Sequence, residues 1–299
     1  MNFNATIAPT ASAPSISSAA MLVDLGISVW TGRKKDKRAS AEVADTNHAK
    51  RGVASVNKAL LGDCEQLAAI VKFGAMVRQS HYASTMPWSD TGLRLLPTAR
   101  YFDYAKQLDG FRMEFDRLVD DFLANYEWEV MQAHAKLGDL FNRDEYPTVD
   151  ALRDKFGFRI NYIPLPDAGD WRVDMEAEAQ QALREQYEGF YKTQMESAMR
   201  DVHDRLMEQL QTFVRQLGVN EEGKRGKIYQ STLDNVRNFA KLLEESNFTD
   251  DPTVALAHAK LRQTLRGLDP EALKKNEQFR DETKRDLEAA IAALPSLDM

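Results

Sequence analysis

The chain has 299 residues and a formal net charge of −7, and its 43% hydrophobic and 28% charged residues are in the ordinary range of globular proteins. This acidic balance argues against a protein that coats DNA, because duplex binding requires clustered positive charge. The single cysteine, Cys64, excludes an intramolecular disulfide. No apolar run reaches the length of about 18 residues that a membrane helix needs, so we expect a soluble, cytoplasmic protein.

The first predicted element is a strand that follows a disordered arm. Residues 1–18 are rich in Ser, Ala, Thr and Pro and lack the basic start and apolar core of a signal peptide. Apolar residues then alternate with other residues at Met21, Val23, Leu25, Ile27 and Val29, which indicates a strand, with a short helix as the alternative. Its expected partner is a strand-like block near residue 156 or the segment at residues 170–175.

The period changes to helical over residues 39–81. The apolar residues of this stretch would share one helix face: Val53, Val56, Leu60, Cys64, Leu67, Val71 and Val77. Gly62 and Gly74 weaken the pattern, so the stretch can divide into two helices. Residues 81–97 are predicted to form a loop, because Pro87, Gly92 and Pro97 interrupt any regular element.

Two long helices flank a small β-element. The first is predicted over residues 99–140, after which Thr148 can cap a short helix. The β-element covers residues 156–175, with a turn at residues 166–169 between its two strands. The second long helix, over residues 175–217, would span roughly 60 Å and needs another long helix to cover it. We therefore predict a long, coiled-coil-like antiparallel helical hairpin with the β-element at its tip.

Shorter helices are expected after the loop at residues 218–227. Ser231 can cap the first, and Asp251-Pro252 and Asp269-Pro270 each resemble a cap followed by a proline in the first turn. The last helix is mostly charged and is expected to be peripheral or to contact a partner. The fold class is thus mainly α, of the α+β type, with an N-terminal strand. Its predicted parts are an arm (1–18), a strand and helical unit (19–97), the hairpin (98–217) and a short-helix region (218–299).

The chain carries no recognisable catalytic signature. Gly223-Lys224-Arg225-Gly226-Lys227 lacks the spacing and the Ser or Thr of a phosphate loop. No two histidines have the spacing that presents a zinc-binding pair on a helix. Cys64 lies on an apolar stripe, where a free cysteine is more often packed than nucleophilic. We therefore expect a protein that is not an enzyme and has no metal or cofactor, although a metal-dependent or cysteine enzyme remains a third hypothesis.

Two basic clusters are the candidate contact sites for a partner or for nucleic acid. The first follows Trp30 and contains Arg33, Lys34, Lys35, Lys37 and Arg38. It can contact nucleic-acid phosphates or an acidic protein surface, or it can be a solvated junction between a strand and a helix, which we favour. The second, weaker cluster contains Lys224, Arg225 and Lys227. Nucleic-acid binding gains support if the two clusters meet in space.

Four blocks of the chain together resemble a known family. They are residues 25–35 (Leu-Gly-Ile-Ser-Val-Trp-Thr-Gly-Arg-Lys-Lys), the aromatic helix around residues 111–126, Tyr146-Pro147 leading to Lys-Phe-Gly-Phe-Arg at residues 155–159, and residues 228–247 with Leu-Asp-Asn-Val-Arg-Asn-Phe. Their order resembles an uncharacterised domain-of-unknown-function family of bacteria and tailed phages, over about residues 21–260. Its members tend to be encoded near a MoxR-type AAA+ ATPase and a protein with a von Willebrand A domain.

The resemblance implies an accessory role in an ATPase-driven remodelling system and brings no catalytic residues. Together with the predicted hairpin, it leads us to expect a non-enzymatic interaction or assembly protein. Such a hairpin leaves apolar surface uncovered, so we expect a homo-oligomer, with the AAA+ ATPase as a further partner. If the protein is phage-encoded, it acts in the host cytoplasm. The alternative is a nucleic-acid-binding accessory protein that uses the basic run at residues 33–38.

Overall fold

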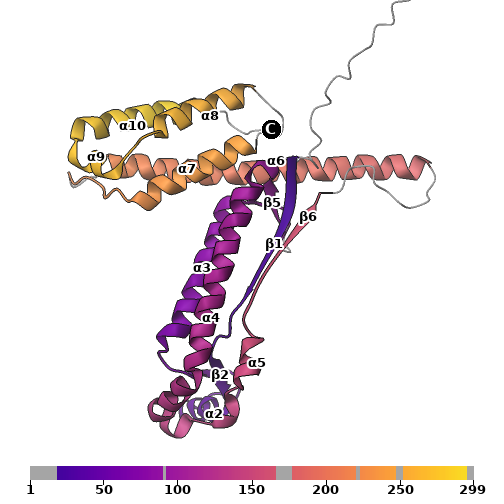
Figure 1. Cartoon of the computed structure of the whole chain (residues 1–299), viewed down its shortest axis with the longest axis vertical. Coiled ribbons are helices and arrows are strands. Elements are labelled where there is room, and N and C mark those ends of the chain that lie inside the picture. Colours follow the sequence, from indigo (N-terminus) through magenta and orange to yellow (C-terminus); the bar gives the residue numbers. More distant parts are fainter. Residues whose placement is uncertain (1–18, 90–91, 166–176, 220–222, 247–251, 295–299) are drawn as a thin grey trace, which may run out of the picture. The chain divides into compact units, whose positions relative to one another are not determined.

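The computed structural model describes residues 19–89, 92–165, 177–219, 223–246 and 252–294 (Figure 1). The chain forms two compact units, each built from segments that are distant in the sequence. Unit 1 contains Met1–Asp24, Tyr82–Tyr104 and Asn161–Met299, and unit 2 contains Leu25–His81 and Ala105–Ile160. The fold is mainly helical with small sheets, as predicted.

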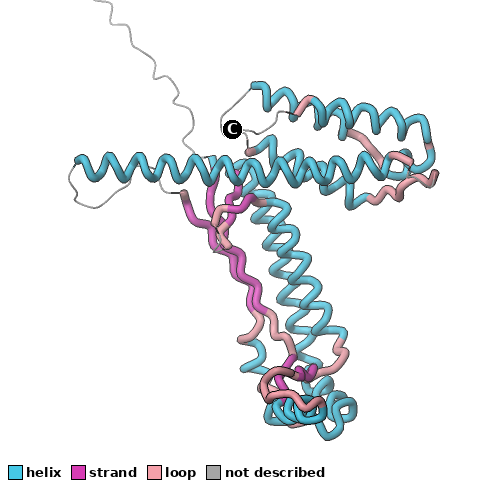
Figure 2. Tube along the Cα trace, turned by 180° about the vertical axis from the view of Figure 1, so that it is seen from behind, coloured by secondary structure: helices cyan, strands magenta, loops and turns pink. Residues whose placement is uncertain are grey.

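Unit 2 is built around two long helices, α3 (Glu65–Ser84) and α4 (Tyr101–Leu137), whose ends belong to unit 1. The two helices lie side by side, with parts of strands β1 (Ala20–Ser28) and β6 (Gly157–Pro164) along them (Figures 1 and 2). Aromatic side chains fill the space between these layers. The ring centroid of Phe122 lies 5.8 Å from that of Phe156 and 5.9 Å from that of Tyr126. Burial raises the pKa of Tyr126 to about 12.

A second, smaller sheet joins β2 (Arg33–Asp36) to β3 (Val56–Ala59). The two strands are antiparallel, with Lys34 opposite Lys58. Helix α2 (Lys37–Thr46) follows β2 directly, and Asp36 caps it by accepting a hydrogen bond from the Ala39 N–H at 2.9 Å. The helical stretch predicted over residues 39–81 is divided into two helices, as the alternative allowed. The helical pattern was wrong at residues 47–64, where a turn, β3 and a loop separate α2 from α3.

Unit 1 combines the edge of the larger sheet with a group of helices. The sheet has the order β4-β5-β1-β6, in which β5 (Arg94–Pro97) is antiparallel both to β4 (Met86–Pro87) and to β1. These two short strands occupy the region predicted to be a loop. The loop prediction failed because prolines at strand ends do not prevent pairing, as Pro87 and Pro97 show.

The helices of unit 1 pack around the C-terminal part of α6 (Ala177–Leu217). Helices α7 (Gln230–Glu245) and α10 (Glu277–Ala292) contact α6, while α8 (Pro252–Leu265) contacts α7 and α10 (Figure 2). The short helix α9 (Pro270–Lys275) precedes α10. The core contains Leu206, Leu210 and Phe213 of α6, all fully buried.

Both long helices are confirmed, but the hairpin between them is not. Helix α4 lies mainly in unit 2 and α6 lies in unit 1. The apolar stripe of α4 is covered by α3 and the strands, and that of α6 is covered by α7 and α10. Each long helix therefore has covering partners within its own unit, which the assumption of a single pairing partner did not anticipate.

Several local predictions are confirmed. Strand β1 neighbours β6, which is the block near residue 156, and Phe158, Ile160 and Tyr162 alternate with exposed residues along β6. The hydroxyl of Thr148 caps α5 (Val149–Arg153), and Asp269 caps α9. The second strand at residues 170–175, the turn at 166–169, Asp251 and the arm at 1–18 lie outside the described residues.

Two predictions for the C-terminal helices need correction. The N-cap of α7 is Tyr229, which makes no side-chain capping bond, so Ser231 lies inside the helix rather than at its cap. The charged stretch after Pro270 is two helices, because Asn276 ends α9 and caps α10 by accepting from the Phe279 N–H at 3.0 Å. Helix α10 is also less peripheral than expected, since Leu287 is fully buried.

Candidate interaction surfaces

Trp30 belongs to the core of unit 2 rather than to a binding surface. Its ring centroid lies 6.4 Å from that of Phe122 and 6.1 Å from that of Tyr126. The indole is only partly exposed and packs against the buried aromatic cluster. Trp30 is therefore explained by packing, and it is not positioned to stack freely on a nucleic-acid base.

The basic run after Trp30 forms β2 and the first turn of α2. Arg33, Lys35, Lys37 and Arg38 are all exposed. Their side chains make no hydrogen bond or ion pair with any residue that the structure describes. Lys37 and Arg38 occupy the start of α2, where the helix dipole disfavours positive charge. We call these four side chains the β2–α2 surface.

The remaining charges of this region form a cluster beneath the β2–α2 surface. The Lys58 ammonium lies 3.3 Å from an Asp36 carboxylate oxygen and 2.7 Å from one of Glu145, and it donates to the Leu140 carbonyl at 2.7 Å. The Lys58 side chain is only 7% exposed, and Lys34 lies 4.0 Å from Glu145. The hydrogen bond to Glu145 raises the pKa of Lys58, and the Ala39 N–H lowers that of Asp36.

The carboxylates of this cluster are not available to pair with the cations of the β2–α2 surface. The carboxylates of Asp36 and Glu145 balance the charges of Lys34 and Lys58. Asp36, the only acid in the basic run, is therefore directed inward and neutralised there. The sequence could not separate the buried lysine from the exposed ones, because Lys58 was assigned to a helix instead of a strand opposite Lys34.

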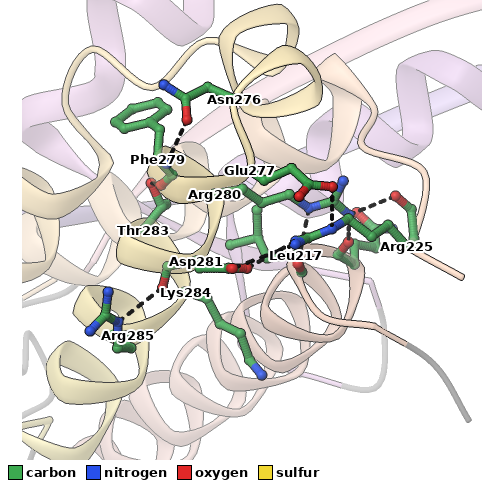
Figure 3. A network of polar contacts seen from close by, with 12 residues as sticks. Leu217, Arg225, Asn276, Glu277, Phe279, Arg280, Asp281, Thr283, Lys284 and Arg285 are labelled. Carbon is green, nitrogen blue, oxygen red and sulfur yellow. Dashed lines mark hydrogen bonds and ion pairs between the residues drawn. The ribbon is translucent and has the colours of Figure 1, made fainter. Parts of the chain in front are cut away.

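The second basic cluster contains an arginine that is held by ion pairs. Arg225 donates to Asp281 at 2.9 Å and lies 3.4 Å from Glu277 (Figure 3). The hydrogen bond to Asp281 raises the pKa of Arg225 and lowers that of Asp281. Lys224 and Lys227 are exposed. The two basic clusters belong to different units, so the structure does not show that they meet in space.

Arg280 lies under this ion pair and was not anticipated from the sequence. It is 5% exposed and donates to the carbonyls of Leu217 at 2.9 Å, Gly226 at 2.8 Å and Gln216 (Figure 3). Leu217 ends α6, so Arg280 satisfies carbonyls that have no partner within the helix. A Cβ on Gly226 would lie 2.7 Å from the Gln216 carbonyl oxygen, which explains the glycine. The cluster of Arg225 and Arg280 is thus structural.

A similar arrangement closes the C-terminal end of α3, within unit 1. Carbonyls of residues 82–85 accept hydrogen bonds from Arg94, Arg100, Arg205 and Asn238 over 2.7 to 3.4 Å. Burial lowers the pKa of Arg94 and Arg100. Cations at a helix C-terminus are favourable, so these arginines are also explained by the fold.

A groove of about 790 Å³ lies between α7 and α8. Three of its basic side chains have partners: Arg262 donates to Glu244 at 2.8 Å, Lys241 lies 3.5 Å from Glu245, and Arg237 donates to the Leu268 carbonyl at 2.7 Å. The contact between Arg262 and Glu244 joins the two helices, whereas Lys241 pairs within α7 and Arg237 binds a carbonyl beyond the end of α8. Most of the positive charge in the groove is therefore already paired within the protein and is not free to bind a ligand.

The outer side of α3 in unit 2 carries an apolar surface. One side of the helix is buried through Leu67, Ile70 and Val77. On its exposed side, Val71 and Met76 are 48% and 39% exposed. We define the α3 outer face as Ala68, Val71, Lys72, Ala75 and Met76, all of them exposed. A helix with apolar residues on both sides is typical of one that is covered on both sides.

The groups that could support catalysis are the single cysteine and possible metal ligands. Cys64 is buried in the core of unit 2, and burial raises the pKa of its thiol. Within the described residues, no group of three or more His, Cys, Asp or Glu side chains could hold a metal ion. Across the same residues, no helix combines the length and apolar character needed to cross a membrane.

Comparison with known proteins identifies a family. The model of a family described as a protein of unknown function, DUF3150, matches residues 18–284. No curated protein and no solved structure matches this chain.

Proposed function

The chain belongs to the DUF3150 family, whose function is unknown, and we propose that it is a non-enzymatic assembly protein that associates with itself. The observation that carries this proposal is the α3 outer face. Four of its five side chains are apolar, and Lys72 supplies its one charge. Exposed apolar surface on a helix whose other side is already buried favours a further protein contact.

A second copy of the same helix suits this face. If two α3 helices pack antiparallel about a two-fold axis between Phe73 and Gly74, Val71 of one copy lies opposite Met76 of the other. The same arrangement places Lys72 opposite Ala75, so the two lysines do not face each other. Small side chains at Ala68 and Ala75 allow the helices to approach closely. An interface of this kind is self-complementary, as a two-fold dimer requires.

The test is a charge exchange measured by light scattering. Because a buried charge without a partner is costly, Val71→Glu and Met76→Lys should each give a monomer where the unchanged protein is a dimer. Mixing the two variants should restore a heterodimer, since the carboxylate introduced in one variant would then face the ammonium introduced in the other. Both variants should keep the circular dichroism of the unchanged protein.

Leu256→Glu is the matched control, because Leu256 is an exposed apolar residue on a helix of unit 1 and is 74% exposed. This variant should remain a dimer. A strictly monomeric unchanged protein at high concentration would contradict self-association. A dimer that survives Val71→Glu would place the interface elsewhere.

The wider expectations also remain part of the proposal. We propose a AAA+ ATPase of the MoxR type as a partner, an accessory role in a phage or bacterial system, and a cytoplasmic location. Their support is the resemblance of the four sequence blocks. Affinity purification of the tagged protein from its own cell should recover such an ATPase together with a second copy of this chain, and recovery of neither would contradict the proposed partnership.

A further inference from the structure

We propose that the β2–α2 surface of unit 2, formed by Arg33, Lys35, Lys37 and Arg38, binds the phosphate backbone of nucleic acid without reading its sequence. All four side chains are exposed and have no ionic partner among the described residues. The nearby acids Asp36 and Glu145 are already balanced by Lys34 and Lys58. The surface therefore presents four cations that form no ion pair with a described residue, on a chain whose net charge is −7.

The geometry suits a linear array of phosphates. Arg33 and Lys35 are two residues apart on β2, so they point to the same side of the strand with a spacing of roughly 6.6 Å. Lys37 and Arg38 continue the run into the first turn of α2. Arginine and lysine side chains are the groups that contact phosphates in most protein–nucleic acid interfaces.

The same surface is less suited to an acidic protein. Protein interfaces usually have an apolar centre surrounded by polar residues. Between residues 33 and 38 every exposed side chain is cationic, so this run itself offers no apolar centre. The nearby aromatic side chain, Trp30, packs in the core against Phe122 and Tyr126. Base stacking is therefore not available from this residue, which is why we infer contact with the backbone alone.

The position of Lys37 and Arg38 supports a binding role over a purely structural one. Positive charge in the first turn of a helix opposes the helix dipole. Asp36 caps α2 through the Ala39 N–H and pairs with Lys58, not with the side chains of Lys37 and Arg38. If the fold were the only requirement, acidic residues would suit these positions better. Replacing both with Glu should keep or raise the melting temperature while it removes binding.

The experiment measures the full-length protein by fluorescence anisotropy with a short labelled DNA duplex of arbitrary sequence. With four phosphate contacts, the association constant should fall about 100-fold between 50 and 200 mM salt. A variant with Gln at all four positions should lose at least this much affinity at low salt. Lys37→Glu with Arg38→Glu should also lose binding, with no fall in melting temperature.

The matched control removes the same amount of charge elsewhere. It replaces four exposed lysines with Gln and should retain most of the binding: Lys106, Lys155, Lys260 and Lys275. Absence of binding at low salt, or equal losses in the control and in the four-site variant, would overturn the proposal. Equal binding to poly-glutamate would also overturn it, because an acidic protein would then serve as the partner. These outcomes are independent of the dimer proposed for the α3 outer face. Val71→Glu, which should give a monomer, should bind the duplex with the same affinity per binding site as the unchanged protein.

Discussion

Arg280 shows how one buried side chain can hold three segments of unit 1 together. It belongs to α10, and its hydrogen bonds reach the last residues of α6 and the loop at Gly226. Burial lowers the pKa of Arg280, with the neighbouring Arg225 as a further cause. The guanidinium remains charged because arginine has a very high ordinary pKa, and the carbonyl oxygens solvate it.

Arg280→Met should lower the free energy of unfolding by about 3 kcal/mol, because three carbonyl acceptors lose their donor in a buried site. Urea unfolding followed by circular dichroism measures this. Arg285→Met on the same helix is the control, since Arg285 is exposed and makes only a 3.4 Å contact with the Asp281 carbonyl. A loss in the Arg280 variant no larger than that in the control would show that water replaces the guanidinium.

The sequence predicted residues with local signals and missed those with distant partners. Thr148 and Asp269 were recognised as caps because the bonds they make are three residues away. Arg280 and Lys58 carry no such signal, since their partners lie far along the chain. The candidate residues Trp30 and Arg225 were identified, but their packing and ion pairs could only be found from the structure.

At the scale of elements, long periodic segments were predictable and short charged strands were not. Helices α4 and α6 and strands β1 and β6 all carry clear apolar periods. Strand β2 contains only Arg, Lys and Asp, so no alternation marks it. Val56 and Leu60 happened to continue the helical spacing of α3, although Val56 lies in β3. Tertiary pairing overrides local pattern in such segments.

The β2–β3 sheet depends on the ion cluster beneath it. Lys58→Met should destabilise the protein by about 3 kcal/mol, because it leaves the carboxylates of Asp36 and Glu145, which are 11% and 16% exposed, without their shared cation. Thermal and urea unfolding measure the change. Adding Glu145→Gln to this variant should recover part of the loss, since one of the unpaired charges is then removed.

Lys50→Met is the matched control for this variant, because Lys50 is an exposed lysine between α2 and β3. It should change stability little, as surface substitutions usually do. If the double variant were less stable than Lys58→Met alone, the carboxylates would not be the cause of the loss. The cluster would then have to act through the hydrogen bond to the Leu140 carbonyl.

For the whole molecule, the acidic excess is unevenly distributed. Unit 2 contains nearly equal numbers of acidic and basic residues, so the acidic excess of the chain lies in unit 1. A net charge calculated for the whole chain therefore concealed the local character of the β2–α2 surface. The acidic balance of the whole chain still disfavours a protein that coats DNA, whereas a local phosphate contact depends on one surface.

Stability should fall in two steps as the pH decreases. Burial lowers the pKa of His258, which is 4% exposed; Glu244 acts in the opposite direction and His203 in the same direction. The unfolded chain then binds the proton more readily, so stability is lost as the pH falls below about 6.5. Asp36, Asp63 and Asp281 have lowered pKa values, so their contribution is lost below about 3.8.

Urea midpoints measured across this pH range test the assignment. His258→Gln should flatten the first step and leave the second unchanged. His134→Gln is the control, because His134 is exposed on α4, and it should keep both steps. A first step that persists in the His258 variant would assign it to another group.

The discontinuous units impose an order on folding during synthesis. All residues of unit 2 have been translated once Ile160 has left the ribosome, whereas unit 1 still lacks its largest segment, Asn161–Met299. Because domains generally fold as units as the chain emerges, unit 2 can become compact first. The residues Tyr82–Tyr104, which include the carbonyls that Arg205 and Asn238 bind, must meanwhile wait for α6 and α7. A ribosome stalled once Ile160 has emerged from the exit tunnel would thus carry a protease-resistant unit 2 and a sensitive site between Tyr82 and Tyr104.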